Sequence, residues 1–156
     1  MSTPSAEQRL EESGLCLPPS PTPLGAYVES VQTGNLLFLS GTLPVEGGKP
    51  AFQGRIGAEL SVEEGQRAAR LAALNALSLA RQHLGSLDKV HRVVRLGVFL
   101  VTSADFREHP RVADAASELL RSVFGVDKMS TRLVLGMATL PLGVCVELEV
   151  ILEIET

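Results

Sequence analysis

The stretch from Leu60 to Gly85, LSVEEGQRAARLAALNALSLARQHLG, decides how this chain folds. Ser61 can accept a hydrogen bond from the first turn of a helix, and Glu64, three residues later, completes a capping box. The positions that follow supply a wide apolar face of small residues, and the final glycine stops the helix. The stretch therefore predicts a long helix that runs to about Leu84 and packs one face against a sheet.

The segment after this helix, His91–Val101 (HRVVRLGVFLV), has the period-two pattern of a strand. Its apolar positions of one parity are expected to share one face of the sheet: Val94, Leu96, Val98 and Leu100. The other parity is predicted to form the second face: His91, Val93, Arg95, Gly97, Phe99 and Val101. This strand therefore presents one fully apolar face and one mixed face.

Further strands and a second helix are predicted in the rest of the chain, before and after these two segments. A second helix is expected over Pro110–Phe124, with the proline in its first turn and Gly125 after its end. Strands are predicted at Tyr27–Val31 and Leu36–Leu39, around the turn Thr33-Gly34-Asn35, and at Thr131–Ala138 and Val144–Ile154, around Leu140–Gly143. The order β-β-(β)-α-β-α-β-β predicts an α+β fold, in which two long helices cover one face of a mixed sheet.

The N-terminal residues have a different character from the rest. Residues 5–14 predict a short polar helix, and the proline-rich segment Leu17–Gly25 predicts an extended lead-in without regular structure. We therefore expect a helical extension over residues 1–16 and a single domain over residues 17–156.

Composition excludes several classes of function. The 156 residues are 45% hydrophobic and 21% charged, with a net charge of −4 and no cluster of basic residues, so nucleic acid is not an expected partner. The two cysteines, Cys16 and Cys145, and the three histidines lack disulfide or metal-ligand spacing, so no metal is expected. Neither a signal peptide nor a membrane span is evident, which predicts a cytoplasmic protein.

The last strand carries an unusual pattern. Its even positions are all apolar and are expected to pack under the helices, whereas its odd positions place Cys145, Glu147, Glu149 and Ile151 on the opposite face. That face mixes charges with apolar residues and is too apolar to be left bare. We therefore expect an oligomer whose sheets meet at its centre, with Arg95 or Arg132 neutralising the two glutamates. Cys145 is expected to be a small buried filler rather than a nucleophile.

Several segments together resemble the RidA/YjgF family, in particular its longer subgroup of about 150 residues. They are Gly25–Val28, Gly34–Gly41, Ala68–Arg70 with Leu74-Asn75, Phe124-Gly125, Thr131-Arg132, and Leu140–Gly143 followed by Val146–Glu149. Each segment alone is weak, but their order and spacing match over residues 17–154. The resemblance implies a chorismate-mutase-like, two-layer fold assembled as a homotrimer, with clefts between adjacent subunits.

The resemblance also implies an activity, the hydrolysis of 2-aminoacrylate-type enamines and imines to 2-keto acids and ammonia, without a cofactor. In the family an arginine holds the substrate carboxylate, and a glutamate fifteen residues later positions the attacking water; Arg132 and Glu147 match this spacing. Tyr27 and Ser40 match further cleft residues, and Asp114 falls where many relatives have asparagine. The implied partner is a small 2-imino or 2-enamino acid.

The chain departs from the family pattern at several positions. Arg132 lies between Thr131 and Leu133, and Thr42 replaces the usual glutamine after Ser-Gly. The carboxylate of Asp114 would disfavour an anionic substrate. Two other functions therefore stay open: a non-catalytic trimer that binds a 2-keto acid or a similar anion, and the endoribonuclease or translation-inhibitor activity often attributed to the family.

Overall fold

Five strands form one sheet in the order β1-β2-β7-β5-β6 in the computed structural model, which describes residues 2–156. The strands are β1 (Ser30–Thr33), β2 (Leu36–Leu39), β5 (Val90–Val101), β6 (Thr131–Met137) and β7 (Val146–Ile154). Only β5 and β6 pair in parallel, and the other three pairings are antiparallel. The mixed sheet predicted from the sequence is confirmed.

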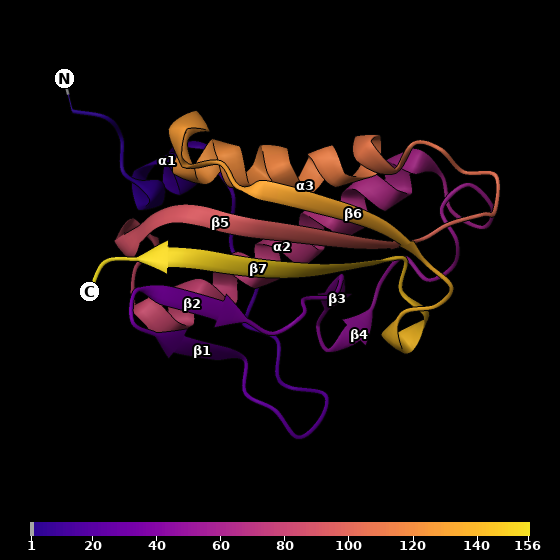
Figure 1. Cartoon of the computed structure of the whole chain (residues 1–156), viewed down its shortest axis with the longest axis horizontal. Coiled ribbons are helices and arrows are strands. Elements are labelled where there is room, and N and C mark those ends of the chain that lie inside the picture. The colour runs from indigo at the N-terminus through magenta and orange to yellow at the C-terminus, as the bar shows by residue number, and fades with distance from the viewer. Residues whose placement is uncertain (1) are drawn as a thin grey trace.

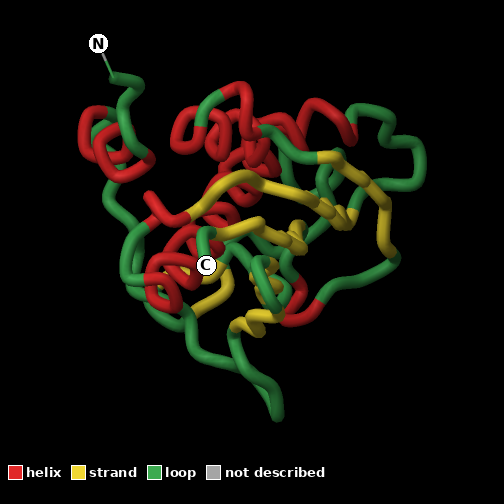
Figure 2. Tube along the Cα trace, turned by 60° about the vertical axis from the view of Figure 1, so that its left-hand side comes forward, coloured by secondary structure: helices red, strands yellow, loops and turns green. Residues whose placement is uncertain are grey.

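The helices α1 (Ala6–Glu12), α2 (Val62–Leu84) and α3 (His109–Phe124) complete the fold, with α2 and α3 covering the same face of the sheet. Figure 2, turned by 60°, shows the helices gathered on one side of the strands. The opposite face, which lies toward the viewer in Figure 1, carries no helix, and we call it the open face. The two-layer α+β architecture is therefore confirmed.

The long helix forms for the reasons that its sequence suggests. Ser61 and Glu64 make both hydrogen bonds of the capping box, and Gly85 ends the helix in the left-handed conformation, with φ 81°. Six alanines of α2 are almost completely buried, and their small side chains let the helix lie close to the sheet: Ala68, Ala69, Ala72, Ala73, Ala76 and Ala80. The core therefore lies between the two helices and the sheet.

The strand β5 contains irregularities that the sequence pattern did not reveal. Its pairing with β7 shifts register between Val90 and Arg92 and again between Val93 and Arg95. These bulges turn Val93 toward the helices, where it is 1% exposed, so its predicted place on the second face is wrong. Beyond the second bulge the predicted alternation holds, with Leu96, Val98 and Leu100 in the core.

Short segments near β7 also differ from the expectations. The loop after β2 contains a small hairpin, β3 (Val45–Glu46) with β4 (Lys49–Pro50). The strand β7 begins at Val146 rather than Val144, because Cys145 donates its backbone N–H to the carbonyl of Phe52 instead of to the sheet. Cys145 consequently lies in the core, which confirms it as a buried filler and corrects its predicted place on the open face.

The N-terminal helix is attached to the end of α2 by its first turn. The carboxylate of Glu7 accepts hydrogen bonds from the guanidinium of Arg81 and from the backbone N–H of Leu87 at 2.8 Å. The hydrogen bond from Arg81 lowers the pKa of Glu7. Leu10, on the same helix, is 3% exposed and belongs to the core. The helix predicted over residues 5–14 is thus present as α1 and packs on the body of the fold.

Candidate functional site

The carboxylate of Glu147 lies on the open face, directly over Gly41. Glu147 pairs with Phe99 of β5, whose side of the sheet is the one without helices. A Cβ atom added to Gly41 would lie 2.2 Å from Oε1 of Glu147, so the absence of a side chain at Gly41 makes room for the carboxylate. Glycine is the one residue type that permits this approach.

Burial raises the pKa of the Glu147 carboxyl above its ordinary value. No ion pair or side-chain hydrogen bond to another of residues 2–156 compensates for this loss of solvent. A half-buried carboxylate without a partner holds a proton more readily and can accept one from water, which suits a general base.

Ser40 connects this carboxylate to the segment that leads into β1. Its Oγ donates to the carbonyl of Val28 at 2.6 Å, and its backbone N–H donates to the carbonyl of Glu29 at 2.9 Å. Tyr27, just before them, accepts a hydrogen bond at its phenolic oxygen from the N–H of Leu24 at 2.9 Å. These contacts explain why β1 begins at Ser30 rather than at Tyr27, as predicted, because residues 24–29 form a turn of their own.

We call Tyr27, Ser40, Gly41 and Glu147 the open-face cluster. The segment that contains Tyr27 extends below the sheet in Figure 1, and Tyr27 is 48% exposed. The structure therefore brings three of the five predicted site residues to one region of the molecule, where Ser40 and Gly41 are neighbours in the chain.

Arg132 lies elsewhere, between β6 and α3. Its Nη1 donates to Oδ1 of Asp114 at 2.7 Å and to Oγ of Ser117 at 3.1 Å. Asp114 and Ser117 are three residues apart on α3, so both point to the same side of the helix. We call these three residues the helix-edge cluster. The two remaining predicted site residues, Arg132 and Asp114, are thus in direct contact with each other.

The two clusters occupy opposite faces of the sheet. Arg132 pairs with Leu96, which in turn pairs with the core residue Val150, so the arginine side chain points to the helix side. Glu147 pairs with Phe99, which pairs with Leu135 of β6. Two strand spacings and three residues along β6 place the Cα atoms of Arg132 and Glu147 roughly 14 Å apart. One copy of the chain therefore does not bring both side chains to a single substrate.

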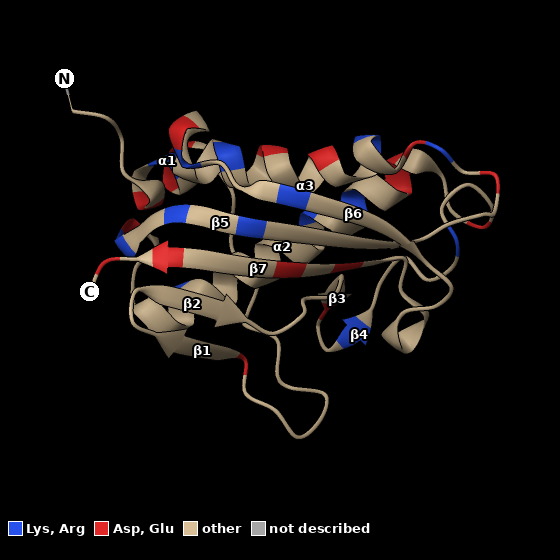
Figure 3. Ribbon diagram, in the orientation of Figure 1, with Lys and Arg blue, Asp and Glu red and all other residues tan. Residues whose placement is uncertain are grey.

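The sequence left open whether Arg95 or Arg132 neutralises the glutamates Glu147 and Glu149 on the open face. Nε of Arg95 lies 3.1 Å from Oε1 of Glu149, whereas Arg132 is engaged by Asp114 on the other side. Figure 3 shows acidic residues along β7 beside basic residues on β5 and β6. Arg95, not Arg132, neutralises Glu149, whereas neither arginine forms an ion pair with Glu147, so the expected neutralisation of that residue is wrong.

Large apolar side chains surround these charges on the open face. The exposed ones come from β1, β2 and β6: Val31, Phe38, Leu133, Leu135 and Met137. Exposed apolar side chains gathered on one face are characteristic of a contact with another protein surface. The observation agrees with the expected burial of this face between subunits.

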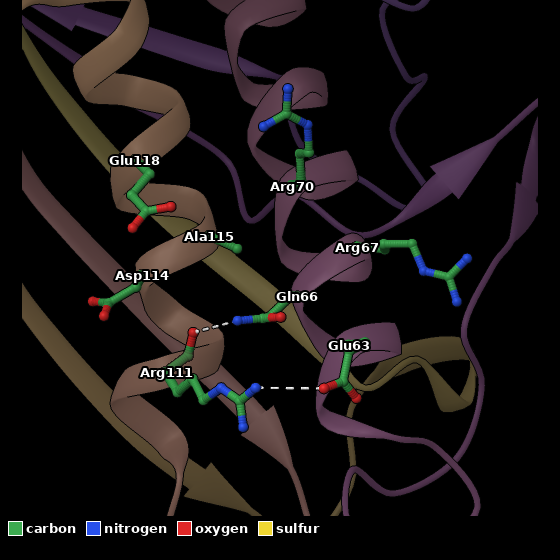
Figure 4. Close-up of a pocket in the computed structure, with 8 residues that line it drawn as sticks. All are labelled: Glu63, Gln66, Arg67, Arg70, Arg111, Asp114, Ala115 and Glu118. Atoms are coloured by element: carbon green, nitrogen blue, oxygen red, sulfur yellow. Dashed lines mark hydrogen bonds and ion pairs between the residues drawn. The ribbon is translucent and has the colours of Figure 1, made fainter.

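A groove of about 460 Å³ separates the outer surfaces of α2 and α3 (Figure 4). The side-chain amide of Gln66 spans the groove and donates to the backbone carbonyl of Arg111. The guanidinium of Arg111 forms an ion pair with Glu63 at 3.4 Å. Both walls carry basic and acidic groups, and the lining residues are Glu63, Gln66, Arg67, Arg70, Arg111, Asp114, Ala115 and Glu118. The groove has no counterpart among the sequence predictions, since it arises from the packing of two helices that are separate in the chain.

Comparison with known proteins identifies the family of the chain. The family described as "YjgF/chorismate_mutase-like, putative endoribonuclease" matches residues 7–154. The chain belongs to the YjgF family. Protein TCP17 of Trypanosoma cruzi is 41% identical over 146 residues, which cover 93% of this chain and 91% of the relative. The resemblance recognised in the sequence is therefore confirmed, as is the chorismate-mutase-like fold.

Two further YjgF relatives have more informative names. A 2-iminobutanoate/2-iminopropanoate deaminase of Dermatophagoides farinae is 28% identical over 138 residues, covering 88% of this chain and 93% of the relative. A solved structure from Shewanella oneidensis, described as a "putative endoribonuclease", is 34% identical with a TM-score of 0.92, and the match covers 97% of this chain and all of that one. Both names thus point to small-molecule or RNA chemistry in close relatives.

Other features of this YjgF chain bear on its chemistry. Burial raises the pKa of the Cys145 thiol to about 12, which removes it as a nucleophile. No helix within residues 2–156 is sufficiently long and apolar to cross a bilayer. Ser117, which was not predicted from the sequence, accepts a hydrogen bond from Arg132; the available signal was its position three residues after Asp114, on the same face of the helix.

Proposed function

We propose that this YjgF protein hydrolyses reactive enamine or imine derivatives of 2-amino acids to 2-keto acids and ammonia. The observation that carries the proposal is the complementarity of the two clusters. One presents a cationic guanidinium that suits a carboxylate, and the other presents an unpaired carboxylate that suits a water molecule. The similarity to an iminobutanoate deaminase supports the same chemistry.

The complete site forms between two copies of the chain. In a single copy Arg132 and Glu147 lie on opposite faces of the sheet, so one copy does not supply both to the same substrate. An assembly that covers the apolar open face brings Arg132 of one copy to Glu147 of its neighbour. A closed homotrimer covers the open faces of all its members and gives three equivalent clefts. The small molecule then binds in each cleft without a cofactor.

The chemistry needs orientation and one proton transfer. Arg132 binds the substrate carboxylate, and Glu147 accepts a proton from water while the water oxygen bonds to the imine carbon. The imine enters with its nitrogen protonated, so this addition gives a carbinolamine with a neutral amino group. The protonated Glu147 then returns its proton to that nitrogen, and the C–N bond breaks as the hydroxyl proton passes to solvent, releasing ammonia and the 2-keto acid. An imine carbon is already electrophilic, so positioning supplies much of the rate enhancement.

A coupled assay tests this proposal. A threonine dehydratase generates the enamine, and keto-acid formation is followed without addition, with the protein and with Arg132→Ala. The protein should accelerate the reaction, and the variant should lose roughly 10²–10³-fold in kcat/KM through the missing charged hydrogen bonds. No acceleration by the protein would contradict deaminase activity and favour a non-catalytic binding trimer.

Co-assembly of two inactive variants tests the site between copies. Arg132→Ala and Glu147→Gln are mixed, dissociated and reassembled, and the activity is compared with that of each variant alone. A site that draws one residue from each copy should recover about a quarter of the activity, because random assembly restores both residues in that fraction of clefts. Sites contained within single copies would recover nothing.

A further inference from the structure

The Asp114–Arg132 contact has features of a tuned binding group rather than an ordinary surface ion pair. Nη1 of Arg132 carries two protons, and its two acceptors are Oδ1 of Asp114 at 2.7 Å and Oγ of Ser117 at 3.1 Å. The side chain of Arg132 is 26% exposed and that of Asp114 is 53% exposed, so the contact lies at the surface, with the guanidinium more covered than the carboxylate. The helix α3 therefore fixes one end of the guanidinium and determines how the group is rotated.

The other edge of the guanidinium stays available. Nε and Nη2 of Arg132 donate no hydrogen bond to any acceptor in residues 2–156. These two groups point their N–H bonds in parallel along one edge, which is a geometry that matches the two oxygens of a carboxylate. Asp114 and Ser117 thus hold Arg132 by Nη1 and present its Nε–Nη2 edge to a ligand.

The charge of Asp114 also affects which ligand can use that edge. A 2-keto acid carries one negative charge, so its carboxylate bound to Arg132 is repelled by the carboxylate already there. A protonated 2-imino acid is a zwitterion, because the positive charge on its nitrogen lies beside the carboxylate and offsets this repulsion. Like charges that share one cation lower each other's affinity for it.

We propose that Asp114 makes the Arg132 site selective for zwitterionic imino acids over the anionic keto acids that their hydrolysis produces. Ser117 acts with it as a positioning residue that holds the guanidinium in place. The inference rests on the proposed function for the identity of the ligands, and it adds a residue that favours release of the product.

Direct titration of stable ligands tests the selectivity without turnover. L-2-aminobutyrate serves as the zwitterion and 2-oxobutanoate as the anion, since both have the same carbon chain. Dissociation constants are measured by calorimetry for the assembled wild-type protein, Asp114→Asn, Asp114→Ala and Ser117→Ala. Glu118→Gln is the matched control, because it removes a negative charge from the same helix at a residue without a hydrogen bond to Arg132.

Asp114→Asn should bind 2-oxobutanoate about tenfold more tightly than the wild type, with L-2-aminobutyrate changed less than about threefold. The asparagine keeps an acceptor for Nη1, so this change in ratio reports charge rather than position. Asp114→Ala and Ser117→Ala should weaken both ligands, because the guanidinium loses its orientation. Glu118→Gln should leave the ratio unchanged.

Three outcomes would overturn the inference: an unchanged ratio of the two affinities in Asp114→Asn, an equal change in Glu118→Gln, or no binding of either ligand to any variant. The failure of the proposed function is a separate result. A protein with the expected change in ratio but without acceleration in the dehydratase-coupled assay would retain the selectivity and lose the deaminase activity.

Discussion

The open-face cluster and the helix-edge cluster differ in how a charged side chain is treated: it has no partner in the first and is paired in the second. Glu147 is half-buried without a partner, and the resulting desolvation raises the pKa of its carboxyl. Arg132 is held by two acceptors on α3, and Asp114 balances its charge within the chain. A charged group without a partner has a shifted pKa that suits proton transfer, whereas a charged group held by partners has a fixed position that suits binding. This difference supports the proposal that the first cluster transfers protons and the second binds the substrate.

Replacement of Glu147 by glutamine gives the largest expected effect on this comparison. Glutamine keeps the size of the side chain but accepts no proton from water, so kcat should fall by roughly 10²–10⁴-fold in the coupled assay. Binding of 2-oxobutanoate, measured by calorimetry, should persist because Arg132 is intact. Loss of binding together with activity would show that Glu147 is part of the recognition group.

Insertion of a methyl group beneath the carboxylate should have the next largest effect. In Gly41→Ala the new Cβ would overlap Oε1 of Glu147, so the carboxylate must rotate away, and kcat/KM should fall by about 10²-fold. The displaced atom is the end of a flexible side chain, and the melting temperature should therefore change little.

A second glycine provides the control for this substitution. At Gly136 of β6 a Cβ would come within 3.2 Å of Nε2 of His109, on the helix side of the sheet. Gly136→Ala should retain most of the activity, since His109 can shift by a few tenths of an ångström. Equal losses in the two variants would indicate a general effect on the sheet and would contradict a specific role for the space above Gly41.

The pH dependence of stability should differ between the clusters. Burial raises the pKa of Glu147 in the folded chain, so the folded state binds the proton more tightly than the unfolded state. The residue therefore reduces stability at pH values above its folded pKa, and this penalty disappears below its unfolded pKa. Glu147→Gln should accordingly raise the melting temperature slightly near neutral pH and leave it unchanged in acid.

The activity should also depend on the ionisation of Glu147, but acid should lower it, whereas acid removes the stability penalty. The reaction requires the ionised carboxylate, so kcat should fall as the pH drops through the raised pKa of Glu147, at a pH above that of an ordinary glutamate. Calorimetric melting and a pH–rate profile on the same preparation check both trends. A melting temperature of Glu147→Gln below that of the wild type at neutral pH would contradict the unpaired state of this carboxylate.

The smallest effect is expected for the ion pair between Arg95 and Glu149 on the open face. Nε of Arg95 and Oε1 of Glu149 lie 3.1 Å apart, and both side chains are more than 40% exposed. Arg95→Gln should therefore change the free energy of unfolding by no more than about 1 kcal/mol in chemical denaturation, with kcat/KM within a few-fold of the wild type. A loss of activity as large as that of Arg132→Ala would show that Arg95 also acts in the reaction and is not only a surface ion pair.

Local signals in the sequence were sufficient for the elements of this fold. The capping box at Ser61, the glycine at position 85 and the proline at position 110 place both long helices almost to the residue, because each acts on hydrogen bonds of its own helix end. The longer strands also follow from alternation, apart from the bulges near Val93 and the starts of β1 and β7. Those exceptions depend on pairing with β7, on a turn held by Ser40 and on the contact of Cys145 with Phe52, which no local pattern encodes.

Residue types and a family spacing of fifteen residues were sufficient to propose Arg132 and Glu147 as candidate site residues. The tertiary structure alone decided their relationship. Parity along one strand is visible in the sequence, but the faces of β6 and β7 can be compared only when both are registered against β5. The contact of Arg132 with Asp114 likewise depends on how α3 packs against the sheet edge, since long-range packing, rather than local preference, sets the distance between side chains eighteen residues apart.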